Sequence, residues 1–365
     1  MSKTPTTLSF KSFDCSCIII NLLIYRLFTR IPTLFPKTAG TAAALSAAFS
    51  AVLAFGLAAL IVSAFLHLPR INIIDAAESV LGVLGRKIVA LIILLYLAVS
   101  AIVALGEFSE LTTLISFPTA PTAFCALFFI VAAIVGAVGG FSSISRLHRI
   151  FVPITTFILF VIVISTLWNG DFSNLFPVLG RGAESVFGKG ISGIIMYTDL
   201  CLLFLISPTD KLTVKSKKPV FISVLFGIFT VVLIIFAFTV RIPYPVSAEG
   251  QFPIYLLLKE IHYGRFFQRI DAILLMVATL SGMLYLSLNL LFLTNTLKTD
   301  FGISDTKPCI FPVALTLFFS SAGVKFIPAE LLKTLLFCSS FAIWAVFLLV
   351  IFFTKVRRKQ LNEKA

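Results

Sequence analysis

The chain has 365 residues, of which 59% are hydrophobic and only 12% are charged, and its mean hydropathy is +1.07. A soluble domain carries about 25% charged residues, so this composition excludes an ordinary soluble protein and indicates an all-α integral membrane protein. The net charge of +13 would suit an acidic partner such as nucleic acid, but the positions of the basic residues decide between such a partner and membrane topology.

Apolar segments long enough to cross a bilayer follow one another along the chain. They fall at about residues 15–35, 39–66, 88–117, 121–141, 150–168, 190–207, 220–240, 272–296, 309–327 and 332–354. This pattern predicts about ten transmembrane helices. The loops between them are too short for a soluble catalytic domain and no catalytic constellation is evident, so we predict that the protein is not an enzyme.

Basic residues gather in alternate loops. If the C-terminal tail lies in the cytoplasm, eighteen Lys and Arg fall on the cytoplasmic side and nine on the other side, while Arg26 and Arg30 lie within the first span. Cytoplasmic loops are enriched in Lys and Arg, so we predict that both termini are cytoplasmic. The basic excess is then a signal of topology, and no nucleic acid partner is expected.

Two segments between the spans have amphipathic spacing. Residues 67–87 predict a short helix on the cytoplasmic membrane surface or, equally, a packed linker, and residues 254–267 could cap the outer mouth. The six cysteines and three histidines show no spacing typical of a metal site or a disulfide framework, so we expect no metal or cofactor. The histidines, at positions 67, 148 and 262, are expected to be solvated loop residues.

Ten helices divide into two blocks of five. An odd block that is repeated must insert with opposite orientation, so we expect one transmembrane domain, residues 1–365, built as an inverted repeat. The first repeat would span about residues 10–168 and the second about 188–354. Helices 1 and 6 are equivalent in this division, and both are unusual, because the first carries Arg26 and Arg30 on one face before Pro32 and the sixth carries Asp199 after a glycine-rich entry at 188–193.

Asp199 lies in the middle of an apolar span. It is roughly 15 Å along the helix from Lys189, which places it near the midplane of a hydrocarbon core about 30 Å thick. An unpaired charge at that depth costs on the order of 3 kcal/mol, so we expect Asp199 to face a cavity, a partner charge or a transported ion. The alternative is an ion pair that serves only packing.

Helix 3 adds two carboxylates, Glu107 and Glu110, on one face towards its outer end. Two arginines in helix 1 balance Asp199 and Glu107 in sign and number, so paired charges are the favoured hypothesis. Two alternatives remain: one arginine binds a substrate carboxylate, or the first segment lies in the membrane interface without spanning it.

Other polar side chains within the spans complete a candidate site. Tyr197, Tyr285 and Asn289 could line a pore, although hydrogen bonds between helices are their commoner role. The candidate substrate-binding residues are Thr29, Arg30, Glu107, Tyr197, Thr198, Asp199, Tyr285 and Asn289, and the candidate charge-pair residues are Arg26, Arg30, Glu107 and Asp199.

Several local sequences, taken in order, resemble one membrane protein family. They are Leu105-Gly106-Glu107-Phe108, Asn174-Leu175-Phe176-Pro177-Val178-Leu179, Gly188-Lys189-Gly190, Asp199, Phe252-Pro253, Gln268-Arg269-Ile270-Asp271-Ala272 and Phe301-Gly302-Ile303. The chain thereby resembles, from about residue 10 to 353, the spore germination permease family. These proteins are the B-type membrane subunits of nutrient germinant receptors, within the amino acid/polyamine/organocation transporter superfamily.

The resemblance implies a leucine-transporter-like 5+5 inverted repeat with discontinuous helices 1 and 6 and a pocket between helices 1, 3, 6 and 8. It further implies assembly with an A-type membrane subunit and a C-type lipoprotein, in the inner membrane of the spore. Helix 1 departs from the family, because Tyr25 to Pro32 contains no glycine where the family usually has a glycine-containing break.

The leading hypothesis is a germinant-receptor subunit that binds a small nutrient, an amino acid, in a transporter-like pocket and passes a conformational change to partner subunits. The rival is a stand-alone proton-coupled amino acid permease in which Asp199 or Glu107 carries the proton. Uptake of labelled amino acids into liposomes would discriminate between them.

Overall fold

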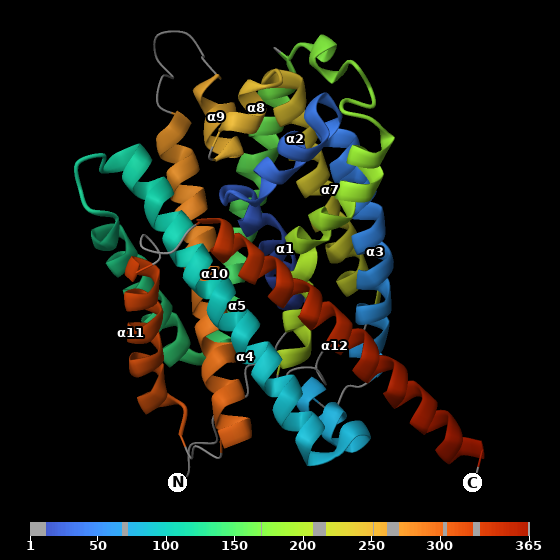
Figure 1. Cartoon of the computed structure of the whole chain (residues 1–365). Helices are drawn as coiled ribbons and strands as arrows, with labels where there is room; N and C mark the ends of the chain where they lie inside the picture. The colour runs from blue at the N-terminus through green and yellow to red at the C-terminus, as the bar shows by residue number, and fades with distance from the viewer. Residues whose placement is uncertain are drawn as a thin grey trace.

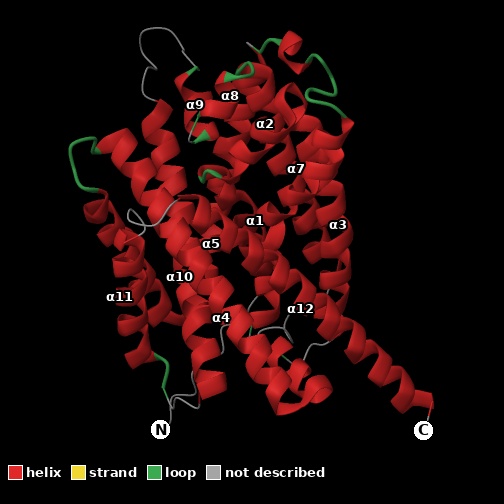
Figure 2. Cartoon of the chain, viewed as in Figure 1, coloured by secondary structure: helices red, strands yellow, loops and turns green. Residues whose placement is uncertain are grey.

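The computed structural model describes residues 12–67, 72–168, 170–206, 217–250, 252–260, 270–301, 305–323 and 329–363. Within these ranges the chain forms helices joined by turns and loops, with no strand (Figures 1 and 2). The all-α membrane fold that the composition predicts is confirmed.

The first part of the chain contains a broken helix followed by three longer elements. Their bounds are α1 Ser12–Ile24, η1 Tyr25–Phe28, η2 Ile31–Thr33, α2 Leu34–Ala39, η3 Gly40–Ala42, α3 Ala43–His67, α4 Ile73–Ser116 and α5 Thr122–Trp168.

The second part is built in the same way, from long helices with short ones between them. Its elements are η4 Phe172–Leu175, η5 Glu184–Gly188, η6 Lys189–Leu205, α7 Lys217–Arg241, α8 Val246–Glu249, α9 Pro253–Lys259, α10 Ile270–Phe301, α11 Lys307–Gly323 and α12 Ala329–Glu363.

Several of these helices are long and apolar enough to cross a membrane. By length and composition, seven stretches of the described chain qualify: Ile31–Leu60, Ile73–Ser116, Thr122–Trp168, Glu184–Leu205, Lys218–Arg241, Ala272–Asp300 and Leu331–Phe353. Lys307–Gly323 is a shorter apolar helix. These helices support a multi-pass integral membrane protein, while the count of ten crossings and the repeat boundaries near 168 and 188 stay predictions.

The segment predicted as two helices, 121–141 and 150–168, does contain two helical stretches, which meet at a kink without the expected loop between them. α5 runs from Thr122 to Trp168 and changes direction at Gly140, whose φ of 75° and ψ of 176° suit only glycine. The second stretch begins directly after Gly140, so it occupies the region that was expected to be a loop. Arg146 and Arg149, expected in a loop, therefore lie on the helix.

Helix 1 is discontinuous even though it has no glycine at the break. The chain leaves α-helical geometry at Tyr25, and Thr29 is extended, with φ −97° and ψ −177°. Arg26 and Arg30 therefore do not share one helical face as the spacing predicts. Helix 6 is irregular rather than unwound at its centre: η5 has π-helical and η6 has 3₁₀ geometry, and the winding continues through Asp199 to Leu205.

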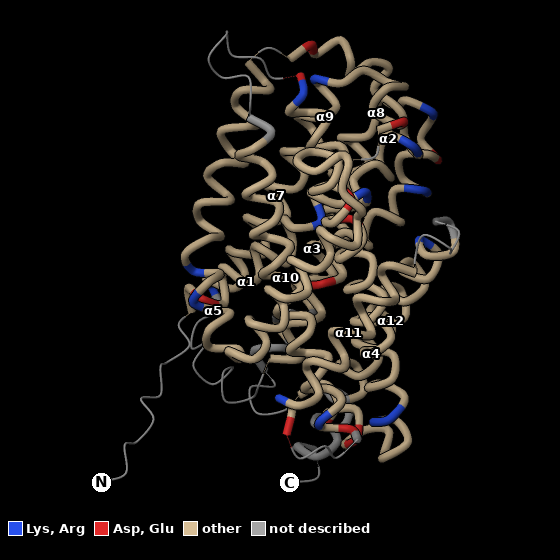
Figure 3. The backbone as a smooth tube through the Cα atoms, turned by 90° about the vertical axis from the view of Figure 1, so that its left-hand side faces the viewer, with Lys and Arg blue, Asp and Glu red and all other residues tan. Residues whose placement is uncertain are grey.

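α1 and η6 occupy the centre of the bundle. Ten of the thirteen residues of α1 are buried, which places it inside the protein and not along the membrane interface. Charged residues gather mainly at the two ends of the molecule, with a few in the middle (Figure 3). One end of the molecule is lower in Figure 1. The helices that end there are α3, η6, α10 and α12, and the helices that begin there are α4, α7 and α11.

The two predicted amphipathic segments have different outcomes. Residues 73–81 form a short helix that precedes Gly82, and Ile73, Ile74 and Ala77 are buried against the protein, so the packed-linker interpretation holds for this face. In the other segment, α9 covers Pro253–Lys259, and residues 261–267 lie outside the described residues.

Candidate functional site

The break in helix 1 places two arginines in different surroundings. Two threonines add side-chain hydrogen bonds to carbonyls at the break that also accept from the backbone N–H groups of the same threonines. Thr29 Oγ1 donates to the carbonyl of Arg26 at 2.6 Å and Thr33 Oγ1 to that of Arg30 at 2.7 Å. Arg26 is buried in the core, whereas Arg30 lines a cavity. Thr29 thus serves the backbone of the break.

The carboxylate of Asp199 is surrounded by donors in the interior. Its Oδ2 accepts from Arg26 Nε at 2.5 Å and from the Tyr25 hydroxyl at 2.7 Å. Its Oδ1 accepts from the Tyr96 hydroxyl at 2.8 Å and lies 3.1 Å from that of Tyr285. We call these five residues the Asp199 cluster. All are at most 2% exposed, so the cost of burying two charges is offset by an ion pair and additional hydrogen bonds.

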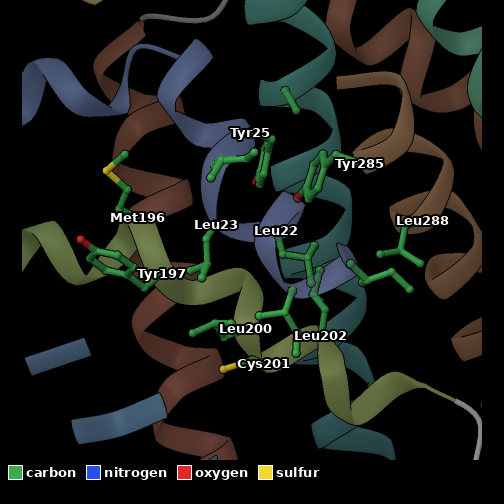
Figure 4. Packing of buried hydrophobic residues seen from close by; sticks show 14 of the residues in the cluster. Leu22, Leu23, Tyr25, Met196, Tyr197, Leu200, Cys201, Leu202, Tyr285 and Leu288 are labelled. Atoms are coloured by element: carbon green, nitrogen blue, oxygen red, sulfur yellow. The ribbon is translucent and has the colours of Figure 1, made fainter. Parts of the chain in front are cut away.

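Further contacts hold the Asp199 cluster in place. The rings of Tyr25 and Tyr285 stack with their centroids 3.7 Å apart, facing one another between α1 and α10 (Figure 4). Asn289 Nδ2 donates to the Tyr285 hydroxyl and to Ser100 Oγ, each at 3.1 Å. Hydrogen bonds from α4 and α10 converge on the carboxylate of η6, so the charge pair is rigid. Moving any one of these helices would break several hydrogen bonds.

A cavity of about 460 Å³ lies between the break in helix 1, α4, α5, α11 and α12. Its lining is mostly apolar, with charged residues from helix 1, α4 and α12. Ligand pockets of this size hold small organic molecules. The lowest residue of α4 in its wall, Ile102, is six positions above Tyr96, so the cavity begins about 9 Å above the Asp199 cluster.

Arg30 organises the charges of the cavity. Its backbone N–H donates to Glu107 Oε2 at 3.0 Å, and its guanidinium forms an ion pair with Glu110. The side chains of Arg30 and Glu110 are 30% and 38% exposed, so this pair remains accessible. Lys37 and Lys333 also line the cavity. Opposite charges thus stand side by side at an open apolar cavity.

The candidate substrate-binding residues do not form one site, because the structure places them in several different surroundings. Arg30 and Glu107 line the cavity, whereas Asp199 and Tyr285 belong to the Asp199 cluster, next to Asn289. Thr198 Oγ1 accepts from Trp344 Nε1 of α12 at 3.1 Å.

Tyr197 is separate from both places. It is fully buried, and its hydroxyl has no hydrogen-bond partner among the described residues. Figure 4 shows its ring pointing away from Tyr25 and Tyr285.

Sequence reasoning missed residues that share faces with those it found. Tyr96 and Ser100 lie eleven and seven positions before Glu107, which are close to whole helical turns, so all three occupy one face of α4. The polar residues of α10 repeat every four positions at 281, 285 and 289. This periodicity of polar residues within apolar helices is the signal that could have found them.

A second polar group in the core corrects a prediction about histidine. His148 is fully buried and not solvated: its Nε2 lies 3.3 Å from Asn21 Nδ2, and its Nδ1 is 2.8 Å from the carbonyl of Ile144. Ser281 Oγ donates to Asn21 Oδ1 at 2.7 Å. His148 lies on α5 because that helix continues through the expected loop, while the side chains of His67 and His262 lie outside the described part of the chain.

The family of the chain follows from a comparison with family models. The model described as "Spore germination protein" matches residues 13–325. The chain belongs to the spore germination protein family. The resemblance that the local sequences indicate is thereby confirmed. No curated protein matches this spore germination protein.

Solved structures with the same fold are secondary transporters. A substrate-bound, Na⁺-coupled sialic acid symporter matches with a TM-score of 0.68 and 14% identity, over 94% of this chain and 79% of its own. Mhp1, a nucleobase-cation-symport-1 family transporter with bromovinylhydantoin bound, matches with a TM-score of 0.63 and 15% identity, over 91% and 77%.

The manganese transporter of Eremococcus coleocola also matches, with a TM-score of 0.61 and 10% identity, over 98% of this chain and 80% of its own. These identities are low, so the likeness shows the fold alone. The spore germination protein therefore has a transporter-like fold of the leucine-transporter type. Among its described residues, no group of three or more His, Cys, Asp or Glu could hold a metal ion.

Proposed function

We propose that this spore germination protein is the membrane subunit of a nutrient germinant receptor and binds an amino acid in the 460 Å³ cavity. The observation that supports this most directly is the Arg30–Glu110 pair at the wall, next to Glu107. A zwitterion needs a cation for its carboxylate and a carboxylate for its ammonium group. Arg30 would bind the ligand carboxylate, and Glu107 and Glu110 would bind the ammonium group.

The Asp199 cluster supports sensing over transport. A ligand passing from the cavity towards the lower end would meet the stacked rings of Tyr25 and Tyr285 and the buried Arg26–Asp199 pair. Opening that layer requires separating a desolvated ion pair, which costs several kcal/mol. Ligand binding can instead move the broken helix 1, since Arg30 lies only four positions after Arg26, and pass the change to an A-type membrane subunit and a C-type lipoprotein.

The proposed orientation follows the charge bias of the loops. The end that holds the cavity faces outwards from the inner membrane of the spore, and the end at which α12 terminates faces the cytoplasm with both termini. Nutrient reaching the spore from outside then meets the open side of the cavity.

Binding and uptake measured on one preparation test this function. The purified protein is reconstituted in liposomes, and labelled amino acids are assayed for saturable binding and for uptake with and without a pH gradient. We expect binding, with uptake no greater than in empty liposomes. Uptake driven by the pH gradient would favour the proton-coupled permease, and saturable binding of no amino acid would overturn the proposed ligand.

A further inference from the structure

Arg86 joins three segments at the lower end of the molecule. Its Nε donates to Asp300 Oδ1 at 3.2 Å and its Nη2 to the carbonyl of Thr299 at 2.9 Å, both in the last turn of α10. Nη1 forms an ion pair with Glu78 and lies 3.7 Å from Asp75, both on residues 73–81, which we call the base helix. A cation beside the C-terminal carbonyls of α10 also interacts favourably with the helix dipole.

The base helix is tied to η6 as well. Asn72 precedes its first turn, and with the amide oriented to satisfy both neighbours, its Nδ2 donates to the carbonyls of Phe204 and Ile206, each at 3.1 Å. These carbonyls lie at the end of η6, the element that carries Asp199. Ile73 and Ile74 are buried beside this contact. The base helix therefore bridges the lower ends of η6 and α10.

Gly82 gives the base helix a joint with the rest of α4. Its φ of 74° and ψ of −172° lie in a region that is essentially restricted to glycine. The helical hydrogen bonds are interrupted there, so residues 73–81 can move as a unit while residues 83–116 stay packed. The contacts of Arg86 with Asp75 and Glu78 cross this joint, and the contacts of Asn72 hold the base helix to η6, so both oppose that motion.

The contacts of Arg86 form a clamp between the base helix and α10. Four of its donor contacts converge on carboxylates and a carbonyl from two elements, and the side chain of Asp300 is only 6% exposed. The cavity, by contrast, lies towards the opposite end, and helix 1, α4 and α12 contribute to its wall. If ligand binds only to molecules whose lower end is clamped, the apparent affinity is proportional to the fraction of molecules in that clamped state.

We propose that Arg86 is a positioning residue for the cavity: by clamping the base helix to α10, it holds the lower end closed and maintains the ligand-competent state. The effect on ligand rests on the proposed function, whereas the closure of the lower end does not. The Arg86→Gln variant loses the charge-assisted hydrogen bonds of the guanidinium group. The lower end should then open more often, and a smaller fraction of the molecules should be in the ligand-competent state.

Two readouts test the clamp separately. The first is thiol labelling of Cys201, which is fully buried on η6, in a background whose other cysteines, at 15, 17, 125, 309 and 338, are changed to Ala. We expect N-ethylmaleimide to label Cys201 at least threefold faster in Arg86→Gln than in Lys87→Gln. Lys87 is the matched control, since it is the adjacent residue, is exposed and carries the same charge.

The second readout is the half-maximal nutrient concentration for binding, expected to rise at least fivefold in Arg86→Gln and to stay within twofold in Lys87→Gln. Asp300→Asn serves as a second variant, with the same direction expected if Arg86→Gln does not accumulate. Equal labelling of Cys201 in the clamp variants and the control would overturn the clamp. Faster labelling with no nutrient response in any variant, wild type included, would uphold the clamp and reject the proposed function.

Discussion

Arg26 and Asp199 meet at 2.5 Å in the core, although they lie 173 positions apart in the sequence and are at most 2% exposed. Each is the counter-charge that makes the other tolerable at this depth. Three tyrosine hydroxyls complete the coordination of the carboxylate. The pair joins the break of helix 1 to η6, the two elements that the sequence marks as unusual.

The first prediction concerns the stability of this pair. Asp199→Asn leaves the Arg26 guanidinium buried without a counter-charge, so we expect a loss of about 3–5 kcal/mol. Arg26→Met combined with Asp199→Leu should lose less, because no charge remains. Thermal unfolding of the purified variants in detergent measures this, with Asp171→Asn as the control at an exposed loop carboxylate. A double variant that is less stable than Asp199→Asn would contradict the pairing.

The second prediction separates the cavity pair from the core pair. Glu110→Gln removes a partly exposed partner of Arg30, so we expect stability to change by only about 0.2–1 kcal/mol. If Glu110 binds the ligand ammonium group, the half-maximal nutrient concentration should rise about tenfold or more, since a charge-assisted hydrogen bond contributes about 1.5–3 kcal/mol. Dose-response at matched protein levels is the measurement.

Glu184→Gln is the matched control for Glu110→Gln. Glu184 is an exposed carboxylate at the start of η5, outside the wall of the cavity. An equal dose-response in the two variants would remove Glu110 from the binding site. A large loss of stability in Glu110→Gln would instead show that its pair with Arg30 is structural.

The third prediction concerns a glycine within the first part of η6. A Cβ on Gly193 would lie 2.4 Å from Ser50 Oγ and 2.6 Å from the ring of Phe35, so Gly193→Ala should destabilise the protein by about 1–3 kcal/mol. Gly188→Ala is the control, because its Cβ would meet Glu184 Cγ at an ordinary 3.6 Å. Equal unfolding temperatures of the two variants would mean that η6 can shift away from α3 without cost.

The fourth prediction tests sidedness. Lys87, on the part of α4 just after Gly82, and Glu249, the last residue of α8, are both exposed. α8 lies at the opposite end of the molecule from the start of α4 (Figure 1). In intact cells that express cysteine-free protein carrying one introduced thiol, a membrane-impermeant maleimide should label Glu249→Cys and spare Lys87→Cys until the cells are opened. The reverse pattern would invert the topology that the loop charges predict.

The depth of Asp199 and the number of balancing charges were readable from the sequence, because a buried carboxylate needs a partner and few cations lie within the spans. Which arginine pairs with which carboxylate was not readable. An i, i+4 spacing predicts one face, but the break at Tyr25–Thr29 turns Arg26 inwards and Arg30 towards Glu110. The local sequence contains no glycine that would predict this break. The break is therefore maintained by tertiary contacts and not by the conformational freedom of a glycine.

Composition and apolar periodicity by themselves determined the membrane class and the positions of most helices, because the bilayer imposes length and polarity on every span. The order of several local sequences indicated the family. Only the tertiary structure decided that Asp199 is enclosed by Tyr25, Tyr96 and Tyr285 and that the cavity lies about two turns above it on α4. It also decided that His148 is buried, because α5 bends at Gly140 and continues where a loop was expected. These outcomes depend on which helices meet. Polar periodicity within α4 and α10 marks the faces that carry such residues, but it does not say which face of another helix each one contacts.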